Sequence, residues 1–231
     1  MSEWYTKIGF DGDPFTKESG FEGHDALVEE VFYAIQSGNM VSIVGDSGSG
    51  KTKILQEIIK RFGGKKKIIY VNCKHMQKLV NVETLLQNRQ GFFKRIMGKK
   101  PSKMILLLDE VESLTSKNCE RIKYYFDQNY LQSVIFTGKS FPVEGMSPSL
   151  VQRISKVLKI DPLSDYEAVR IIRDKIGDKY LTDRVIKTIY SKSGRNTGRL
   201  LQNCKTVMTE IAHGKKDITD EEVEKLLSFE K

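Results

Sequence analysis

The sequence predicts an α/β fold with two parts: a doubly wound, parallel five-stranded core with helices on both faces, followed by a small all-helical lid domain. Three observations lead to this fold class. Short apolar runs alternate with amphipathic helical segments up to about residue 160. One run, Met104-Ile105-Leu106-Leu107-Leu108, is apolar throughout, as expected for a strand buried on both faces of a parallel sheet. Beyond residues 161–163, only helical periodicity remains.

Each element is predicted from its apolar spacing and its flanking residues. Helical spacing predicts a helix from Ala26 to about Ser37, which His24-Asp25 can cap and Gly38 ends. The strands are expected over residues 39–44, 67–72, 104–110, 133–137 and 157–160. Further helices are expected directly after residue 52 and over residues 82–97, 117–128, 164–176, 182–192, 197–213 and 219–228.

These elements divide the chain into three segments. Residues 1–23 are irregular and rich in aromatic residues, and we expect this segment to pack on the α/β core. Residues 24–161 are expected to form the α/β domain, and residues 162–231 the helical lid domain. The chain of 231 residues is long enough for a core of about 150 residues and a smaller appendage.

The chain is basic, with 38 Lys+Arg against 30 Asp+Glu and a formal net charge of +8. This excess is compatible with a polyanionic partner such as nucleic acid, and equally with a lysine-rich solvated surface. The basic residues form short runs without interleaved aromatic residues: Lys65-Lys66-Lys67, Lys94-Arg95, Lys99-Lys100 and Lys215-Lys216.

The composition also indicates a compartment. No apolar run approaches the roughly 20 residues that a membrane span needs, so we expect no membrane contact. The opening Met1-Ser2-Glu3-Trp4 has no apolar stretch and does not predict a secretion signal. Cys73, Cys119 and Cys204 lie far apart, which indicates reduced thiols of a cytoplasmic protein rather than disulfides or a zinc site.

A glycine-rich loop between the first strand and the next helix carries the clearest functional signal. Its sequence, Gly45-Asp46-Ser47-Gly48-Ser49-Gly50-Lys51-Thr52, matches the Walker A pattern G-x-x-x-x-G-K-[ST] in full. The glycines let backbone N–H groups approach phosphate oxygens. Lys51 supplies positive charge to the β- and γ-phosphates, and the Thr52 hydroxyl can ligate Mg²⁺. The strand and helix on either side exclude a flexible linker, so the sequence predicts a P-loop for ATP and Mg²⁺.

A pair of carboxylates follows the most apolar strand. Asp109 is expected to hold Mg²⁺ through water while Thr52 holds it directly. Glu110, expected on the other side of the pleat, is the candidate catalytic residue that orients and polarises the attacking water. The alternative is a solvated pair of carboxylates without a function, which is common in isolation. An apolar strand that ends in Asp-Glu downstream of a full P-loop is far less common, and this context favours the catalytic interpretation. The combination favours a hydrolysing ATPase over a small-molecule kinase, which needs no water-activating glutamate.

With these motifs, nearly the whole chain resembles the AAA+ ATPases, which hydrolyse ATP to ADP and phosphate. The segment Ser147-Pro148-Ser149-Leu150-Val151-Gln152-Arg153-Ile154 is similar to the arginine-finger region of the family. The resemblance implies that Arg153 reaches the γ-phosphate of a neighbouring subunit, and hence that the chain forms a homo-oligomer. A surface arginine at a helix C-terminus is the alternative.

The two sensors of the family match to different degrees. Gly198-Arg199-Leu200-Leu201 resembles the second sensor, which implies that Arg199 contacts the nucleotide in the same subunit, with Arg195 as the alternative. Family members commonly carry a small polar residue such as Asn at the first sensor. The segment Phe136-Thr137-Gly138-Lys139-Ser140 departs from this pattern and offers Thr137 or Lys139. A lysine there would add positive charge near the γ-phosphate rather than orient a water molecule.

Within the family, the opening Trp4-Tyr5…Phe10…Asp13-Pro14-Phe15…Phe21 is similar to ExeA-like and TnsC-like ATPases of secretion and transposition. The core also resembles archaeal origin-recognition ATPases. Those carry a winged-helix domain, for which the 231 residues leave no room, so site-specific origin binding does not carry over. The resemblance implies action on DNA, with duplex DNA favoured. The alternatives are a remodeller or loader with a protein partner, and a nucleotide-dependent scaffold with little hydrolysis.

Overall fold

A computed structural model describes residues 3–17, 22–62, 67–75, 84–85, 102–215 and 218–228. The chain forms two compact units. The α/β unit is Asp25–Ile160, and the helical unit combines Met1–His24 with Asp161–Lys231. In the described part of the chain, no helix combines the length and the apolar character needed to cross a membrane.

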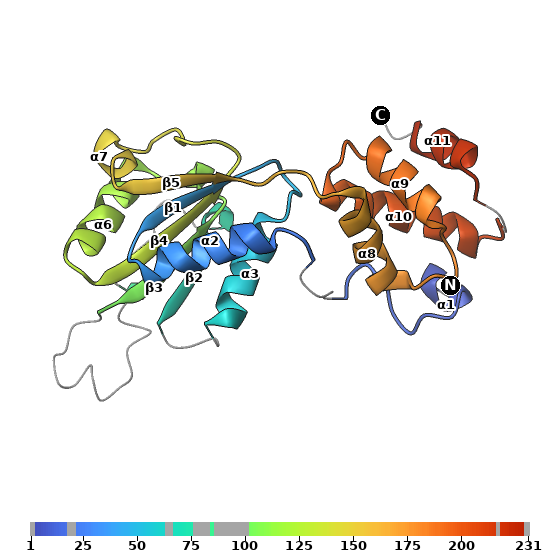
Figure 1. Cartoon of the computed structure of the whole chain (residues 1–231), viewed down its shortest axis with the longest axis horizontal. Helices are drawn as coiled ribbons and strands as arrows, with labels where there is room; N and C mark the ends of the chain where they lie inside the picture. Colours follow the sequence, from blue (N-terminus) through green and yellow to red (C-terminus); the bar gives the residue numbers. More distant parts are fainter. Residues whose placement is uncertain are drawn as a thin grey trace. The chain divides into compact units, whose positions relative to one another are not determined.

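The α/β unit is built on a five-stranded sheet with the strand order β2-β3-β4-β1-β5 (Figure 1). Every neighbouring pair of strands is parallel. The carboxyl ends of the strands therefore lie along one edge of the sheet, where ligands bind in open α/β folds. The strands are β1 (Met40–Val44), β2 (Ile68–Asn72), β3 (Met104–Asp109), β4 (Leu131–Gly138) and β5 (Ile154–Lys159).

Helices cover both faces of this sheet. Helices α2 and α3 pack on one face and α6 on the other (Figure 1). The α/β unit contains α2 (Asp25–Gln36), α3 (Lys51–Arg61), α6 (Ser116–Asp127), the short α7 (Pro148–Val151) and the 3₁₀ turns η1 (Cys73–His75) and η2 (Val111–Ser113). The doubly wound α/β fold class predicted from the sequence is the one observed.

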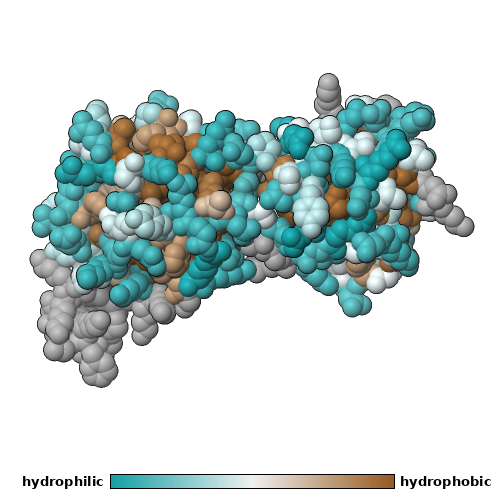
Figure 2. Space-filling view, viewed as in Figure 1, coloured by the Kyte–Doolittle hydropathy of each residue, from teal (hydrophilic) through white to brown (hydrophobic). Residues whose placement is uncertain are grey.

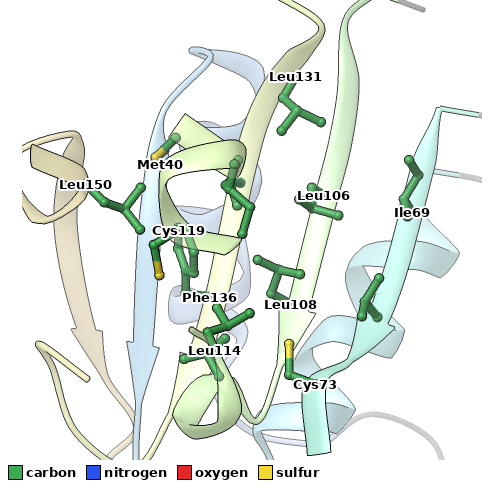
Figure 3. Close-up of a cluster of buried hydrophobic side chains, with 14 of the residues drawn as sticks. Met40, Ile69, Cys73, Leu106, Leu108, Leu114, Cys119, Leu131, Phe136 and Leu150 are labelled. Atoms are coloured by element: carbon green, nitrogen blue, oxygen red, sulfur yellow. The ribbon is translucent and has the colours of Figure 1, made fainter. Parts of the chain in front are cut away.

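The face of the sheet under α6 is covered by a core of buried apolar side chains (Figure 3). Leu106 and Leu108 of β3, Phe136 of β4 and Ile122 of α6 are all fully buried there. Each such side chain contributes about 1.5–3 kcal/mol of burial free energy. Because side chains alternate along a strand, Asp109 follows Leu108 on the opposite face, the face of the P-loop helix α3.

The helical unit contains α1 (Trp4–Lys7), α8 (Asp165–Ile176), α9 (Asp183–Lys192), α10 (Thr197–Ala212) and α11 (Asp220–Ser228). Three of its helices begin at a residue whose side chain accepts from the first turn: Ser164, Thr182 and Asn196. Ser164 forms a capping box with Glu167. These caps fix the helix starts that the sequence predicts to within one residue.

The aromatic segment at the start of the chain packs on the helical unit. Trp4, Phe10 and Phe15 lie against the helical core. The segment is held there by the Tyr180 hydroxyl, which donates to the carbonyl of Ile8, and by an ion pair of 2.6 Å between Lys205 and Asp13. The expectation that residues 1–23 pack on the α/β core is therefore wrong. Aromatic content predicts that the segment is buried, but does not indicate which unit buries it.

Some elements differ from the sequence prediction. Strand β5 begins at Ile154, three residues before the predicted start. The prediction missed these residues because the early part of this edge strand is polar and exposed and lacks an apolar pattern. The helix expected over 82–97 lies outside the described residues, apart from 84–85, and so do the basic runs at 94–95 and 99–100. The three cysteines are free and buried. Burial raises the pKa of Cys73 to about 12 and that of Cys119 to about 11.

Candidate nucleotide site

The loop between β1 and α3 is shaped by its glycines. Gly48 and Gly50 have φ values of 81° and 102°, which favour glycine. A Cβ atom at Gly45 would lie 2.7 Å from Ser49 Oγ and 3.2 Å from Ile160 Cβ. The loop is tied to the end of β4, because the Gly45 N–H donates to the Gly138 carbonyl at 3.1 Å. The loop therefore curves over the carboxyl end of the sheet and leads directly into the N-terminus of α3.

Lys51 is the first residue of α3, and its side chain is held by the loop. Its ammonium donates to the carbonyls of Gly45 and Asp46 at 2.7 and 2.8 Å. An ammonium has three N–H donors, so one donor remains for a phosphate. Burial lowers the pKa of Lys51, while nearby carboxylates, led by Glu112, favour its charged form.

Asp109 is the centre of the hydrogen-bond network at the end of β3. Its side chain is fully buried. Asp109 Oδ2 accepts from Thr52 Oγ1 at 2.7 Å and from the Tyr70 hydroxyl at 3.0 Å. Asp109 Oδ1 accepts from the Glu110 N–H at 3.1 Å and from the Thr137 hydroxyl. A buried carboxylate with this many donors is held in one orientation.

Thr52 and Asp109 together fit a magnesium ion. Thr52 donates its proton to Asp109, so the lone pairs of its hydroxyl oxygen remain available to a cation. Both groups offer hard oxygen ligands, which Mg²⁺ prefers. The described residues contain no group of three or more His, Cys, Asp or Glu side chains arranged for a metal ion. This donor set suits an ion that takes its remaining ligands from nucleotide phosphates and water.

Glu110 adopts a strained backbone conformation directly after β3. Its φ of 53° is left-handed, and the residue is the N-cap of the turn η2 rather than a continuation of the strand. The expected position on the other side of the pleat is therefore replaced by a turn. Left-handed conformations of non-glycine residues are costly and cluster at functional sites. The side chain is partly exposed, as a water-activating group must be.

The two candidates for the first sensor have different environments. Thr137 is fully buried in β4, and its hydroxyl donates to Asp109. Lys139 follows the end of β4 and is exposed, and its backbone N–H donates to Glu112 Oε1 at 2.6 Å. The structure thus brings Thr137 into the Asp109 network and places the Lys139 side chain at the surface.

Arg153 lies at the other end of the sheet. It directly precedes β5, whose first residue pairs with Met40 at the start of β1, whereas the P-loop follows the end of β1. Its guanidinium donates to both carboxylate oxygens of Asp127, at 3.0 and 3.3 Å, and this contact raises the pKa of Arg153. Arg153 therefore cannot serve the P-loop of its own α/β unit.

The two arginines of the helical unit also differ. Arg195 donates to Asp165 at 2.7 Å and lies 5.4 Å from the centre of the Tyr190 ring. Arg199 uses its backbone N–H in the N-cap of α10, where it donates to Asn196 at 3.0 Å, and its side chain is exposed. Within the described residues, the Arg199 guanidinium has no hydrogen-bond or ion-pair partner, so of the two it is the one available to a ligand.

Tyr70 is the residue of this site that the sequence analysis missed. No motif contains it, and its contact with Asp109 depends on β2 lying beside β3 in the sheet. The available signal was its alternation with Ile69 and Val71, which puts Tyr70 on the same face as Asp109. Burial raises the pKa of Tyr70 to about 12, with the Asp109 charge as the next cause.

Comparison with known proteins identifies the family. A family model described as "AAA domain" matches residues 37–169, which is more than half of the chain. The chain belongs to the AAA domain family. This confirms the AAA+ P-loop ATPase family predicted from the sequence. A search of curated proteins gave no significant match.

Solved structures show the same fold at low sequence identity. The Thermotoga maritima RuvB Holliday junction branch migration motor has a TM-score of 0.68 at 16% identity, covering 94% of this chain and 73% of RuvB. The Aeropyrum pernix Orc1 protein, solved in complex with DNA, has a TM-score of 0.69 at 15% identity, with coverages of 94% and 68%. Domain III of the Thermotoga maritima replication initiation protein DnaA has a TM-score of 0.63 at 20% identity, with coverages of 95% and 97%. At these identities, the matches establish the fold alone.

Proposed function

We propose that this AAA protein binds ATP with Mg²⁺ at the carboxyl end of its sheet and hydrolyses it to ADP and phosphate. The observation that carries the proposal is the 2.7 Å hydrogen bond from Thr52 to Asp109 beneath the glycine loop. It joins the last residue of the Walker A motif to the carboxylate at the end of β3, between β2 and β4 in the sheet. A P-loop without this partner would bind phosphate but would lack half of the Mg²⁺ site.

Each residue of the site has a separate task in this reaction. Residues 45–51 bind the phosphates through backbone N–H groups and the Lys51 ammonium. Thr52 and Asp109 hold the Mg²⁺ ion, which when bound stabilises the negative charge of the transferred phosphoryl group. Glu110 orients the attacking water and takes up its proton. The exposed Arg199 of the helical unit senses the nucleotide.

We further propose that the protein assembles into a homo-oligomer with nucleotide. Arg153 lies at the opposite end of the sheet from its own P-loop, where it would reach the γ-phosphate of a neighbouring subunit. The adjoining edge strand β5 exposes an apolar residue, Val157, which is 43% exposed. Figure 2 shows apolar colour on the surface of the α/β unit around β5 and α7. Apolar surface beside the arginine supports an interface there.

The proposed substrate of the assembly is DNA, with duplex DNA favoured. Two observations support this choice: the net charge of +8, and the fold shared with Orc1 solved in complex with DNA and with a Holliday junction branch migration motor. A second candidate is a nucleotide-dependent scaffold with little hydrolysis. The observation that favours it is the Thr137 hydroxyl, which is committed to Asp109 instead of to an attacking water.

One assay separates these functions. The rate of phosphate release is measured with Mg²⁺ and ATP, with and without duplex DNA, beside light scattering in the presence of an ATP analogue. We expect measurable turnover that rises with DNA, and assembly that depends on nucleotide. Turnover that DNA leaves unchanged would favour a protein-directed remodeller or loader. Binding and assembly without turnover would favour the scaffold.

A further inference from the structure

Tyr70 places its phenol on the carboxylate that we assign to magnesium. Its hydroxyl lies 3.0 Å from Asp109 Oδ2, the same oxygen that accepts from Thr52 Oγ1 at 2.7 Å. The contact follows from the parallel register of the two strands, in which Asn72 at the end of β2 pairs with Asp109. Tyr70 lies two residues earlier on the same face, close enough for its long side chain to reach the end of β3.

The other oxygen of Asp109 is held from the opposite side of β3. The Thr137 hydroxyl on β4 and the Glu110 N–H both donate to Oδ1. Each oxygen of the carboxylate therefore accepts from two donors, Oδ1 from these two groups and Oδ2 from Thr52 and Tyr70. Any rotation of the carboxylate would therefore break hydrogen bonds on both oxygens.

We propose that Tyr70 is a positioning residue for magnesium: its hydroxyl holds Asp109 in the orientation in which Asp109 and Thr52 bind the ion. This inference rests on the proposed function, because it concerns the metal of that same site. Hydrogen bonds to the carboxylate of a metal site orient it, and their loss lowers metal affinity by about 10–100-fold. Tyr70 acts through Asp109 and is not itself a catalytic residue.

The variant Tyr70→Phe is suited to test this role. Tyr70 is 37% exposed, and when its hydroxyl is removed, Asp109 Oδ2 still accepts a hydrogen bond from Thr52. The fold of the variant is therefore expected to stay intact. The measurement is the affinity for a fluorescent ADP analogue, first in excess EDTA and then in magnesium chloride. The ratio of the two affinities reports magnesium binding without any need for turnover.

In the wild-type chain we expect tighter nucleotide binding with magnesium than with EDTA. In Tyr70→Phe, this gain should shrink by about 10-fold or more, while the affinity in EDTA and the unfolding temperature stay unchanged. The matched control is Tyr33→Phe on α2, where the side chain is 71% exposed and outside the site, and where the gain should equal that of the wild type.

Two results in the variant would overturn the inference. An undiminished magnesium gain in Tyr70→Phe would show that Asp109 keeps its orientation without the phenol. Equal weakening in EDTA and in magnesium would show that Tyr70 only shapes the pocket. A wild-type chain that binds the nucleotide with no magnesium gain would overturn the proposed function of the site as well, so the two failures are distinguishable.

Discussion

The two ends of the parallel sheet present their charged side chains in different ways. At the carboxyl end, Asp109 is fully buried among hydroxyl and N–H donors, and Lys51 is held by two carbonyl oxygens. At the amino end, Arg153 is half exposed and its ion pair is with Asp127 at the surface. The chain itself therefore fixes the groups assigned to phosphate and metal, while Arg153 lies where another molecule can reach it.

The largest expected effect concerns turnover at the carboxyl end. Glu110→Gln keeps the shape of the side chain but removes its charge, so Mg·ATP should still bind while turnover falls by roughly 10²–10⁴-fold, as for a lost general base. Phosphate release and binding of a fluorescent ATP analogue measure the two quantities separately. Glu112→Gln is measured beside it to test the alternative residue, and Glu144→Gln, an exposed glutamate of the α/β unit, is the control. Equal turnover in Glu110→Gln and the wild type would move the catalytic role, with Glu112 as the next candidate.

The next effect concerns nucleotide binding. Lys51→Ala removes the ammonium that faces the phosphates. The affinity for a fluorescent ATP analogue should fall by about 10–150-fold, because one charge-assisted hydrogen bond contributes about 1.5–3 kcal/mol. Lys60→Ala, an exposed lysine of the same helix α3, is the matched control. A folded Lys51→Ala protein with unchanged affinity would refute the phosphate site.

At the amino end, the expected effect depends on assembly. Arg153→Ala and Lys51→Ala subunits should each be inactive alone, but a Lys51→Ala subunit still offers its arginine to an Arg153→Ala neighbour that binds ATP. In an equal mixture, we expect recovery of up to about one quarter of the sites, because half of the sites bind ATP and half of those face a competent arginine. Full activity of Arg153→Ala at every protein concentration would show that the residue is an ordinary surface arginine.

The smallest effect separates the two arginines of the helical unit. Arg195→Ala loses the contacts with Asp165 and Tyr190 and should lower the unfolding free energy by no more than about 1 kcal/mol, since the ion pair is exposed. Arg199→Ala should leave thermal unfolding unchanged and weaken ATP binding. The reverse pattern, with a loss of ATP affinity in Arg195→Ala alone, would make Arg195 the sensor.

Local motifs of this sequence predict the carboxyl end of the sheet better than they predict which strands are neighbours. Residues 45–52 and Asp109 were predicted as neighbours because the motif is local and the carboxyl ends of parallel strands share one edge. Tyr70 was missed because its contact depends on which strand lies beside β3. Local sequence patterns do not predict the order of strands in a sheet. The first residues of β5 were not predicted as strand because they are polar and exposed. The aromatic residues of 1–23 indicate burial but do not indicate which unit buries them.

The central claim is that Thr52 and Asp109 hold magnesium together with ATP, and Thr52→Val tests it most directly. This change keeps the shape of the side chain and removes the hydroxyl that bonds to Asp109. The measurement is the affinity for a fluorescent ATP analogue in magnesium and in EDTA, for the wild type and the variant. We predict tighter binding with magnesium in the wild type, and loss of that gain in Thr52→Val with the EDTA affinity unchanged. The same magnesium gain in both proteins would contradict the account.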